Sequence, residues 1–443
     1  MKIVAKAGVA MQKLFGPIAE EVGRRVGLIV RKRKFTASSL TQMFVMGHLA
    51  KPAATDEDLA QIANQCGADV TTQAVEQRHT PKTVEHLKGV FEQAVKVVVG
   101  SAKSLAPLLQ RFTRVTVLDS TTVTLPDSEK ERFPGCGGSH GGGAAAVKLQ
   151  TELDLNGGGL THIEIEPGRS PDSATCRQHA EHPPGSLRIT DLGYFNVSVF
   201  AAMVAAKVYF LSRLQFGTLV LRSTGHSVGD ILEWLSGQAG PIVDQRILLG
   251  RDQRLPCRLI AWRLPKEQAD ERRRKLRKEA LSKRNQEPTA KRLAWCDWTI
   301  LVTSVSENML TPPEAIVLYR ARWQIELLFK RWKSKGLVGL LRGSTEVRQL
   351  VRFWSRLLAV LVQHWLMVSC SWGDPSRSWG KVSVAIRRFV ERLLTAMHDL
   401  LELEKVIDHI CRVVAKTCQR NKRSKPGTVE LLNDVSQLDF SLT

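Results

Sequence analysis

The chain has 443 residues, of which 43% are hydrophobic, and it carries 64 lysines and arginines against 43 aspartates and glutamates. This length and hydrophobic content predict a globular protein of two to four domains. The net charge of +21 predicts an anionic partner, either nucleic acid or a membrane surface. The eight cysteines contain no CxxC pair and no Cys/His spacing typical of zinc, so they do not indicate a structural zinc site.

Residues 1–105 are predicted to be helical, with a possible helix-turn-helix at 56–82. Helical spacing in the first part of that segment is interrupted at residues 66–69 and resumes at residues 70–78. A helix-turn-helix would place the following residues on or near a DNA-reading helix: Thr71, Thr72, Gln73, Gln77 and Arg78. The alternative is an ordinary helical hairpin.

The next part of the chain alternates between short apolar strands and helices. A strand is predicted at residues 114–119, and the alternating segments 147–155 and 160–166, joined by Asn-Gly-Gly-Gly, predict a hairpin. Helices are expected near 173–180 and at 196–207, and further strands at 187–191 and 208–214. Three strands in a meander followed by alternating helices and strands is the order of a ribonuclease H-like core.

Residues 215–311 change character and predict a β-rich region. Strands are expected at 245–249, 258–263 and 298–304. Between them, residues 266–292 are dense in arginine and lysine, which is typical of a solvated helix or arm and is also compatible with lying on DNA. The last hundred residues are mostly helical, and their apolar run 357–368 is too short to span a bilayer, so we expect a buried helix.

The most informative segment is 319–333, YRARWQIELLFKRWK. On a single helix, five polar side chains would fall within about 80° of one face: Tyr319, Arg322, Glu326, Lys330 and Lys333. A cationic face attracts phosphate, and a carboxylate among the cations suits a divalent metal that acts on phosphate. The alternative is a solvated helix in which Glu326 and Lys330 form an ordinary i,i+4 pair.

The spacing Tyr-x2-Arg-x3-Glu-x6-Lys resembles the YREK signature of insertion-sequence DDE transposases of the IS-four type. The resemblance covers roughly residues 110–335. It implies an α/β fold, a ribonuclease H-like catalytic core interrupted by a β-rich insertion domain, with helical N- and C-terminal regions. The expected divisions are a helical DNA-binding domain at 1–105, the first part of the core at 110–214, the insertion domain at 215–311, the motif helix of the core at 312–345 and a helical region at 346–443.

Metal-assisted cleavage of a phosphodiester needs about three convergent carboxylates, which hold two Mg²⁺ or Mn²⁺ ions. Asp119 and Asp191 each end an apolar segment, and Asp119-Ser120-Thr121 and Asp191-Leu192-Gly193-Tyr194 resemble the first and second aspartate motifs of the family. Glu326 of the signature would be the third acid. The hairpin holds rival acids: Glu152, Asp154, Glu164 and Glu166.

The resemblance also implies which side chains contact DNA. Tyr319, Arg322 and Lys333 match positions that hold the phosphates of the transposon end, and Lys330 adds a cation. Trp298 is a match for a tryptophan that stacks on a flipped base, and Trp323 would assist it. Core packing is the alternative for both tryptophans.

These observations predict a DNA transposase that binds terminal inverted repeats and performs metal-dependent cleavage and strand transfer by cut-and-paste. The alternatives are a ribonuclease H-like nuclease that cuts without joining, and a catalytically dead DNA-binding regulator. The expected partner is double-stranded DNA, both transposon ends and target, and no membrane is expected. The resemblance also implies a homodimer in the synaptic complex. The N-terminus lacks a secretory pattern, so we expect a cytoplasmic, nucleoid-associated bacterial protein with reduced thiols.

Overall fold

The structure, a computed structural model, describes residues 2–28, 34–102, 104, 106–136, 144–238, 240–334, 345–421 and 425–438. The end of the expected motif segment, residues 335–344, lies outside these ranges. The chain divides into two compact units. Unit 1 comprises Met1–Leu105, Asp119–Ser170 and Gln324–Arg423, and unit 2 comprises Ala106–Leu118, Pro171–Trp323 and Ser424–Thr443. Each unit is therefore assembled from three separate stretches of the chain.

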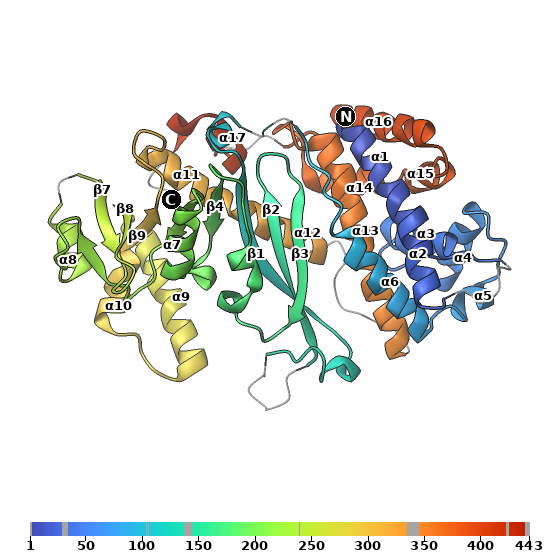
Figure 1. Ribbon diagram of the computed structural model, residues 1–443, viewed down its shortest axis with the longest axis horizontal. Helices are drawn as coiled ribbons and strands as arrows, with labels where there is room; N and C mark the ends of the chain where they lie inside the picture. Colours follow the sequence, from blue (N-terminus) through green and yellow to red (C-terminus); the bar gives the residue numbers. More distant parts are fainter. Residues whose placement is uncertain are drawn as a thin grey trace. The chain divides into compact units, whose positions relative to one another are not determined.

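The N-terminal part of unit 1 is helical, as predicted (Figure 1). Its helices are α1 (Ile3–Lys13), a π-helical turn (Leu14–Ile18), α2 (Ala19–Arg25), α3 (Ala37–Ala50), α4 (Asp56–Gln65), α5 (Thr72–Glu76) and α6 (Pro81–Ala94). Helices α3 to α6 each begin directly after a threonine whose hydroxyl accepts a hydrogen bond from a backbone N–H of the first turn. Such caps satisfy donors that the helix itself leaves unpaired, and they fix where each helix begins.

The C-terminal part of unit 1 is built around one long helix. Its helices are α12 (Trp323–Ser334), α13 (Glu346–Ser371), α14 (Trp379–Arg387), α15 (Val390–Thr395) and α16 (Leu400–Thr417). Helix α13 packs against α3, α6 and α16, and the predicted apolar run lies inside it, almost wholly buried. Helix α13 is long and apolar enough to cross a membrane. However, 94% of its most apolar stretch is buried inside the protein, which is typical of a core helix.

Unit 1 also holds the predicted hairpin of β2 (Ala146–Asp154) and β3 (Leu160–Pro167), which pair antiparallel (Figure 1). A register shift falls between Glu152 and Leu153. His364 of α13 contacts the hairpin turn through a 2.7 Å hydrogen bond between its Nε2 and the carbonyl oxygen of Gly158. The hairpin is thereby tied to the core helix.

Unit 2 combines parallel and antiparallel strands. The first residues of β1 (Val115–Thr124) pair parallel with β4 (Leu187–Thr190), and β4 pairs parallel with β5 (Tyr209–Arg213). The remaining strands pair antiparallel: β6 (Val220–Arg222), β7 (Ile242–Leu249), β8 (Leu255–Arg263) and β9 (Trp298–Thr303). Within unit 2 the strands follow the order β1-β4-β5-β9-β8-β7-β6, with β1 represented by its first residues. The chain is thus a mixed α/β protein with helical terminal regions.

The helices of unit 2 are α7 (Val197–Ala205), α8 (Ile231–Ser236), α9 (Lys266–Arg284), α10 (Ala290–Ala294), α11 (Pro312–Ala321) and α17 (Thr428–Asn433). One buried cluster joins α7 to the strands, and it includes Phe200, Phe210, Leu259 and Val302. The rings of Phe200 and Phe210 are stacked with their centroids 4.4 Å apart. The arginine-rich run forms α9, the solvated helix that its composition predicts.

Three local expectations were wrong. Strand β1 does not end at Asp119 but continues to Thr124. The helix expected near 173–180 is two short 3-10 turns, Asp172–Ala174 and Cys176–His179. The signature does not lie on one helix, because α11 ends at Ala321 and α12 begins at Trp323. At this junction the N–H of Arg322 bonds to the carbonyl oxygen of Tyr319, an i→i+3 bond that tightens the turn.

Candidate active site

The two predicted aspartates come directly after the paired stretch of two neighbouring strands. Leu118 of β1 is the partner of Thr190 of β4, and the two strands run parallel. Asp119 and Asp191 are the next residue of each chain segment. In α/β sheets the carboxyl ends of parallel strands are where ligand-binding side chains collect. Asp191 therefore follows the last residue of β4, and Asp119 is the residue of β1 at which the pairing with β4 ends.

In unit 2, the carboxylate of Asp191 lies next to two residues of the signature. The hydroxyl of Tyr319 donates to Oδ1 of Asp191 at 3.3 Å, and Nη2 of Arg322 is 3.9 Å from the same oxygen. The Arg322 guanidinium also lies over the Tyr319 ring, 5.8 Å from its centroid. The side chain of Arg322 is 9% exposed and that of Asp191 is 41% exposed. The carboxylate therefore reaches solvent, while the guanidinium beside it is buried.

Burial, and then the charge of Asp191, raises the pKa of Tyr319 above its usual range. The phenol is therefore protonated at neutral pH and acts as a hydrogen-bond donor. Arg322 and Arg213 act in the opposite direction on the same pKa. Arg213, the last residue of β5, places a second guanidinium near this cluster.

Arg272 of α9 is a further buried cation close to Arg213 and Tyr319. Burial, together with the charge of Arg213, lowers the pKa of Arg272 to about 10. Its Nη1 donates to Oγ1 of Thr299 at 3.0 Å and to the carbonyl oxygen of Trp298 at 3.3 Å, which ties α9 to β9. Sequence reasoning named neither Arg213 nor Arg272. The position of Arg213 at the end of a predicted strand is the only signal that could have indicated it.

In unit 1, helix α12 carries the remaining signature residues. Glu326, Lys330 and Lys333 share one face at i, i+4 and i+7, and the two lysines are exposed while Glu326 is partly exposed. The opposite face is buried through Ile325, Leu328, Phe329 and Trp332. Helix α12 therefore has the buried face and the charged face that the sequence predicts. The prediction holds only for the signature residues that lie in α12.

Within the described ranges, no group of three or more His, Cys, Asp or Glu side chains is gathered as a ready metal site. Asp119 and Glu326 belong to unit 1, and Asp191 belongs to unit 2. All three side chains are partly exposed and offer only carboxylate oxygens. This donor chemistry fits a hard divalent cation such as Mg²⁺ or Mn²⁺.

The rival acids of the hairpin are engaged within it. Glu152 is fully buried and accepts a 2.7 Å hydrogen bond from the hydroxyl of Thr161. Glu166 accepts a hydrogen bond from Gln150, and Glu164 lies 3.3 Å from the ring of His162. These contacts give the hairpin acids a local structural role.

The two candidate stacking residues differ sharply in exposure. Trp298 is 7% exposed and belongs to the buried cluster of unit 2, with the guanidinium of Arg263 5.7 Å from its ring centroid. Trp323, between α11 and the rest of α12, is 50% exposed. Burial favours the packing alternative for Trp298, whereas the indole of Trp323 is accessible to a ligand.

Comparison with known proteins decides the family. Residues 110–362, more than half of the chain, match the family described as "Transposase DDE domain". The chain belongs to the DDE transposase family. The matched range contains all three predicted acids and the whole signature segment.

Named relatives of the transposase are proteins of bacterial insertion sequences. It is 27% identical over 373 residues to the transposase for insertion sequence element IS231B of Bacillus thuringiensis subsp. berliner, covering 77% of this chain and 75% of the relative. It is 26% identical over 313 residues to the transposase for IS1151 of Clostridium perfringens, covering 66% and 65%. The putative transposase InsL of Escherichia coli (strain K12) is 25% identical over 276 residues, covering 60% and 69%.

The segment 56–82, for which the sequence leaves open a helix-turn-helix or a helical hairpin, contains α4 and α5, and α5 has only five residues. Its exposed side chains include Thr72 and Gln73, whereas Thr71 serves as the cap of α5. The helical hairpin alternative thus stays open. Gln77 is also exposed, and Arg78 lies over the ring of Phe35.

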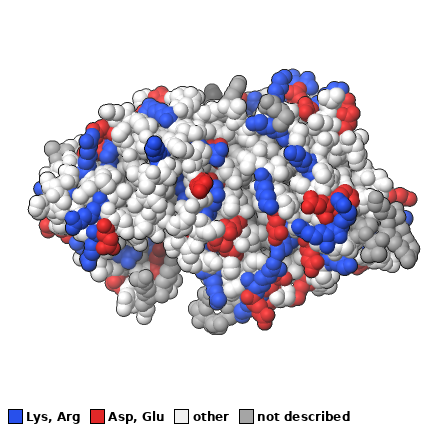
Figure 2. Space-filling view, in the orientation of Figure 1, with Lys and Arg blue, Asp and Glu red and all other residues white. Residues whose placement is uncertain are grey.

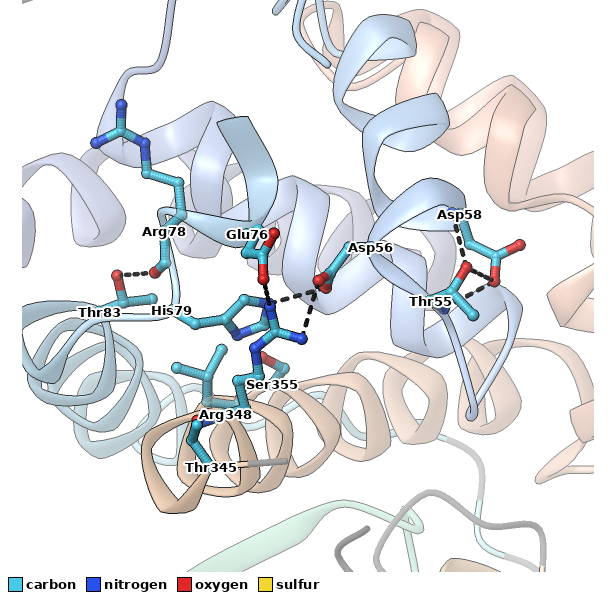
Figure 3. A network of polar contacts seen from close by, with 11 residues as sticks. Thr55, Asp56, Asp58, Glu76, Arg78, His79, Thr83, Thr345, Arg348 and Ser355 are labelled. Carbon is cyan, nitrogen blue, oxygen red and sulfur yellow. Dashed lines mark hydrogen bonds and ion pairs between the residues drawn. The ribbon is translucent and has the colours of Figure 1, made fainter. Parts of the chain in front are cut away.

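A polar network fixes α4 and α5 to α13 (Figure 3). Arg348 of α13 reaches two carboxylates, with Nη1 3.2 Å from Asp56 of α4 and Nη2 2.6 Å from Glu76 of α5. Nε2 of His79 contacts the other oxygen of Asp56 at 2.9 Å. The side chains of Arg348, Asp56 and His79 are 19%, 13% and 2% exposed, whereas that of Glu76 is 61% exposed, so only the Asp56 part of the network is shielded from water.

The basic excess of the transposase is dispersed on the face that Figure 2 displays, where lysines and arginines alternate with acidic side chains. Ion pairs in the described part of unit 2 include Arg246–Glu307 and Lys291–Asp230, so some of its cations are paired locally. A dispersed excess of cations supplies long-range attraction to a polyanion such as DNA.

Proposed function

We propose that this transposase binds the terminal inverted repeats of its own element, cuts the DNA there, and joins the freed 3′-hydroxyls to target DNA by cut-and-paste. The observation that carries the proposal is the position of Asp191. It follows a strand in register with the strand that leads to Asp119, and its carboxylate contacts both Tyr319 and Arg322 of the signature. Family membership gives this arrangement its chemical meaning.

We further propose a ribonuclease H-like core interrupted by a β-rich insertion domain. Support comes from the antiparallel hairpin of β2 and β3, the parallel pairing of β1, β4 and β5, and the antiparallel strands β6 to β9 that come between β5 and α11 in the chain. The domain limits of this proposal are those expected from the sequence: 1–105, 110–214, 215–311, 312–345 and 346–443.

Asp119, Asp191 and Glu326 would hold two divalent ions, Mg²⁺ or Mn²⁺. Such ions lower the pKa of an attacking water or 3′-hydroxyl and stabilise charge on the leaving oxygen. A two-metal site requires these three carboxylates to converge. The buried Arg322 and the protonated Tyr319 would orient the Asp191 carboxylate in such a site.

The signature cations and the exposed indole would bind the DNA itself. Arg322 and Tyr319 present donors suited to phosphate oxygens, and Lys330 and Lys333 offer charge on the accessible face of α12. Trp323 is the first candidate for stacking on a flipped base, because its indole is the more exposed of the two. Trp298, which is more deeply packed, is the second candidate. A homodimer would pair two element ends, and the nucleoid of a bacterial cytoplasm would be the site of action.

A comparison of two variants tests whether Asp191 is needed for DNA cleavage and Arg322 for DNA binding. Asp191→Asn should abolish cleavage of DNA carrying the element ends while leaving end binding intact or improved, since it removes a negative charge near phosphate. Arg322→Ala should weaken binding and reduce the log–log salt slope by about one for each lost phosphate contact. Arg412→Ala, which removes an exposed cation from an i,i+4 surface pair, is the matched control. Equal losses of binding in the Asp191 and Arg322 variants would contradict the proposal.

A further inference from the structure

Two cysteines in the helical part of unit 1 lie in direct contact. Cys370 is in α13 and Cys411 is in α16, two helices that pack against each other. Their sulfur atoms are 2.7 Å apart, and both residues are free thiols, as are the other six cysteines. The two residues are 41 positions apart in sequence, so only packing of the two helices brings them together.

This separation is shorter than a simple packing contact. Non-bonded carbon atoms rest about 3.5–4.0 Å apart, and sulfur is the larger atom. A covalent S–S bond is about 2.05 Å long, so bond formation needs only a small movement of two side chains. Packing of α13 against α16 therefore already brings the two sulfur atoms close to bonding distance.

The two thiols differ in their access to solvent. Cys370 is 2% exposed, whereas Cys411 is partly exposed. The hydrogen bond with Cys411, followed by burial, raises the pKa of Cys370 well above its usual range, although the nearby Arg377 acts in the opposite direction. The accessible Cys411 is thus placed to meet an oxidant first, with Cys370 held behind it as the resolving thiol.

We propose that Cys370 and Cys411 form a reversible disulfide when the protein meets a peroxide. The Cys411 thiolate attacks one peroxide oxygen, breaking the O–O bond, and the products are a sulfenic acid and hydroxide. The Cys370 sulfur then attacks the Cys411 sulfur, and the sulfenic oxygen leaves with the Cys370 proton as water. The two thiols are oxidised by two electrons in total, the peroxide is reduced, and an added dithiol reverses the link.

The bond would connect two core helices of unit 1 across 41 residues of sequence. A crosslink of that span restricts the unfolded chain and so favours the folded state. In a reducing compartment the pair stays as two thiols, and the link forms only under oxidation. This inference is independent of the proposed DNA chemistry.

Peptide mapping of the full-length protein tests it. The reduced protein is treated with a small excess of hydrogen peroxide, remaining thiols are alkylated, and the digest is analysed by mass spectrometry without reduction. We expect one major crosslinked species, containing Cys370 and Cys411, which disappears after dithiothreitol. In addition, the oxidised protein should melt about 5 °C higher than the reduced protein.

Variants make the outcome decisive. Cys411→Ser and Cys370→Ser should each lose both the crosslink and the melting shift, whereas Cys418→Ser, a change at the end of the same α16, should keep both. Cys418 is 3% exposed, so it matches Cys370 in burial. Oxidation that stops at other cysteines, or a Cys370–Cys411 pair that is still fully alkylated after peroxide treatment, would overturn the proposal.

Discussion

At the residue scale, the carboxylate of Asp191 serves two signature residues at once. Its Oδ1 accepts from the phenol of Tyr319 and faces the guanidinium of Arg322. These two contacts orient the carboxylate, while 41% of the Asp191 side chain is exposed. In the proposed metal site, a carboxylate that is already oriented would need less reorganisation during the reaction.

Ionisation of Tyr319 should be visible as a loss of stability at high pH. Its pKa is raised in the folded protein, mainly by burial, so the unfolded chain releases the proton first as the pH rises. The stabilisation is complete below about pH 10 and declines above it, by up to about 1.4 kcal/mol per pH unit. Denaturant unfolding of wild type and Tyr319→Phe between pH 9 and 11 measures this, and parallel curves for the two proteins would refute it.

The two tryptophans should respond differently to truncation. Trp298→Ala should destabilise unit 2 by about 3–5 kcal/mol, because it empties a well-packed site. Trp323→Ala should change stability by less than about 0.5 kcal/mol, because half of that residue is exposed, but it should let nicked DNA accumulate while double-strand products fall. Thermal melts and cleavage gels separate the two. A stable Trp298→Ala protein with the same nicking phenotype would assign the stacking role to Trp298 instead.

The signature predicts which residues matter but not their full surroundings. Tyr319 and Arg322 contact Asp191, which lies 128 and 131 residues before them in the sequence. The spacing of residues within the motif cannot predict contacts with so distant a residue. Arg213 and Arg272 could not be assigned from the sequence, because a strand end and a charged helix are common settings for arginine.

At the element scale, three helices of unit 1 bury histidines. Burial is the main reason that the pKa is lowered to about 3 for His48 of α3 and to about 4 for His86 of α6 and His364 of α13. In the unfolded chain these groups bind protons near pH 6.5, while the folded protein excludes the protons until the pH is much lower. The folded state is therefore favoured above pH 6.5 and loses that advantage as the pH falls.

Replacing one of these histidines should flatten the acid dependence. Between pH 6.5 and about 4 we expect the free energy of unfolding to fall by up to about 1.4 kcal/mol per pH unit for each buried histidine. His86→Gln should remove one such share, so the stability of the variant should depend less on pH than that of the wild type. Denaturant midpoints at pH 7, 6 and 5 provide the measurement; identical slopes for the two proteins would show that folding does not lower the pKa of His86.

Arg348 should be important for the attachment of α4 and α5. Arg348→Ala leaves Asp56 in a shielded position without its guanidinium partner, and we expect a loss of about 2 kcal/mol, between the values for exposed and buried pairs. Arg412→Ala removes an exposed pair with Asp408 and should cost less than about 0.5 kcal/mol. Hydrogen exchange should show early opening of α4 and α5 in Arg348→Ala, and unchanged protection there would contradict this role of the network.

Periodicity predicts most elements because burial sets the pattern. The hairpin of β2 and β3, the strands β4 and β5 and the helix α7 fall within a few residues of their expected positions. The errors occur where burial gives no signal. Strand β1 continues past Asp119 through polar threonines, and the junction at Arg322 interrupts a helical pattern that looks continuous in the sequence.

At the scale of the whole molecule, the two compact units divide the signature between them. Tyr319 and Arg322 belong to unit 2 with Asp191, whereas Glu326, Lys330 and Lys333 belong to unit 1 with Asp119. The net charge of +21 for the whole chain attracts DNA, and salt should weaken that attraction steeply. The proposed chemistry therefore depends on residues from each unit acting on one DNA substrate.

The most direct test is a strand-transfer assay with Mg²⁺, in which labelled DNA carrying the flanks of the gene is offered a plasmid target. The wild-type transposase should produce joined molecules, and Asp119→Asn, Asp191→Asn and Glu326→Gln should each produce none while still binding the labelled DNA. Joined product at wild-type level from any of the three variants would contradict the assignment of the acids, and cleavage without joining by the wild type would contradict cut-and-paste transposition.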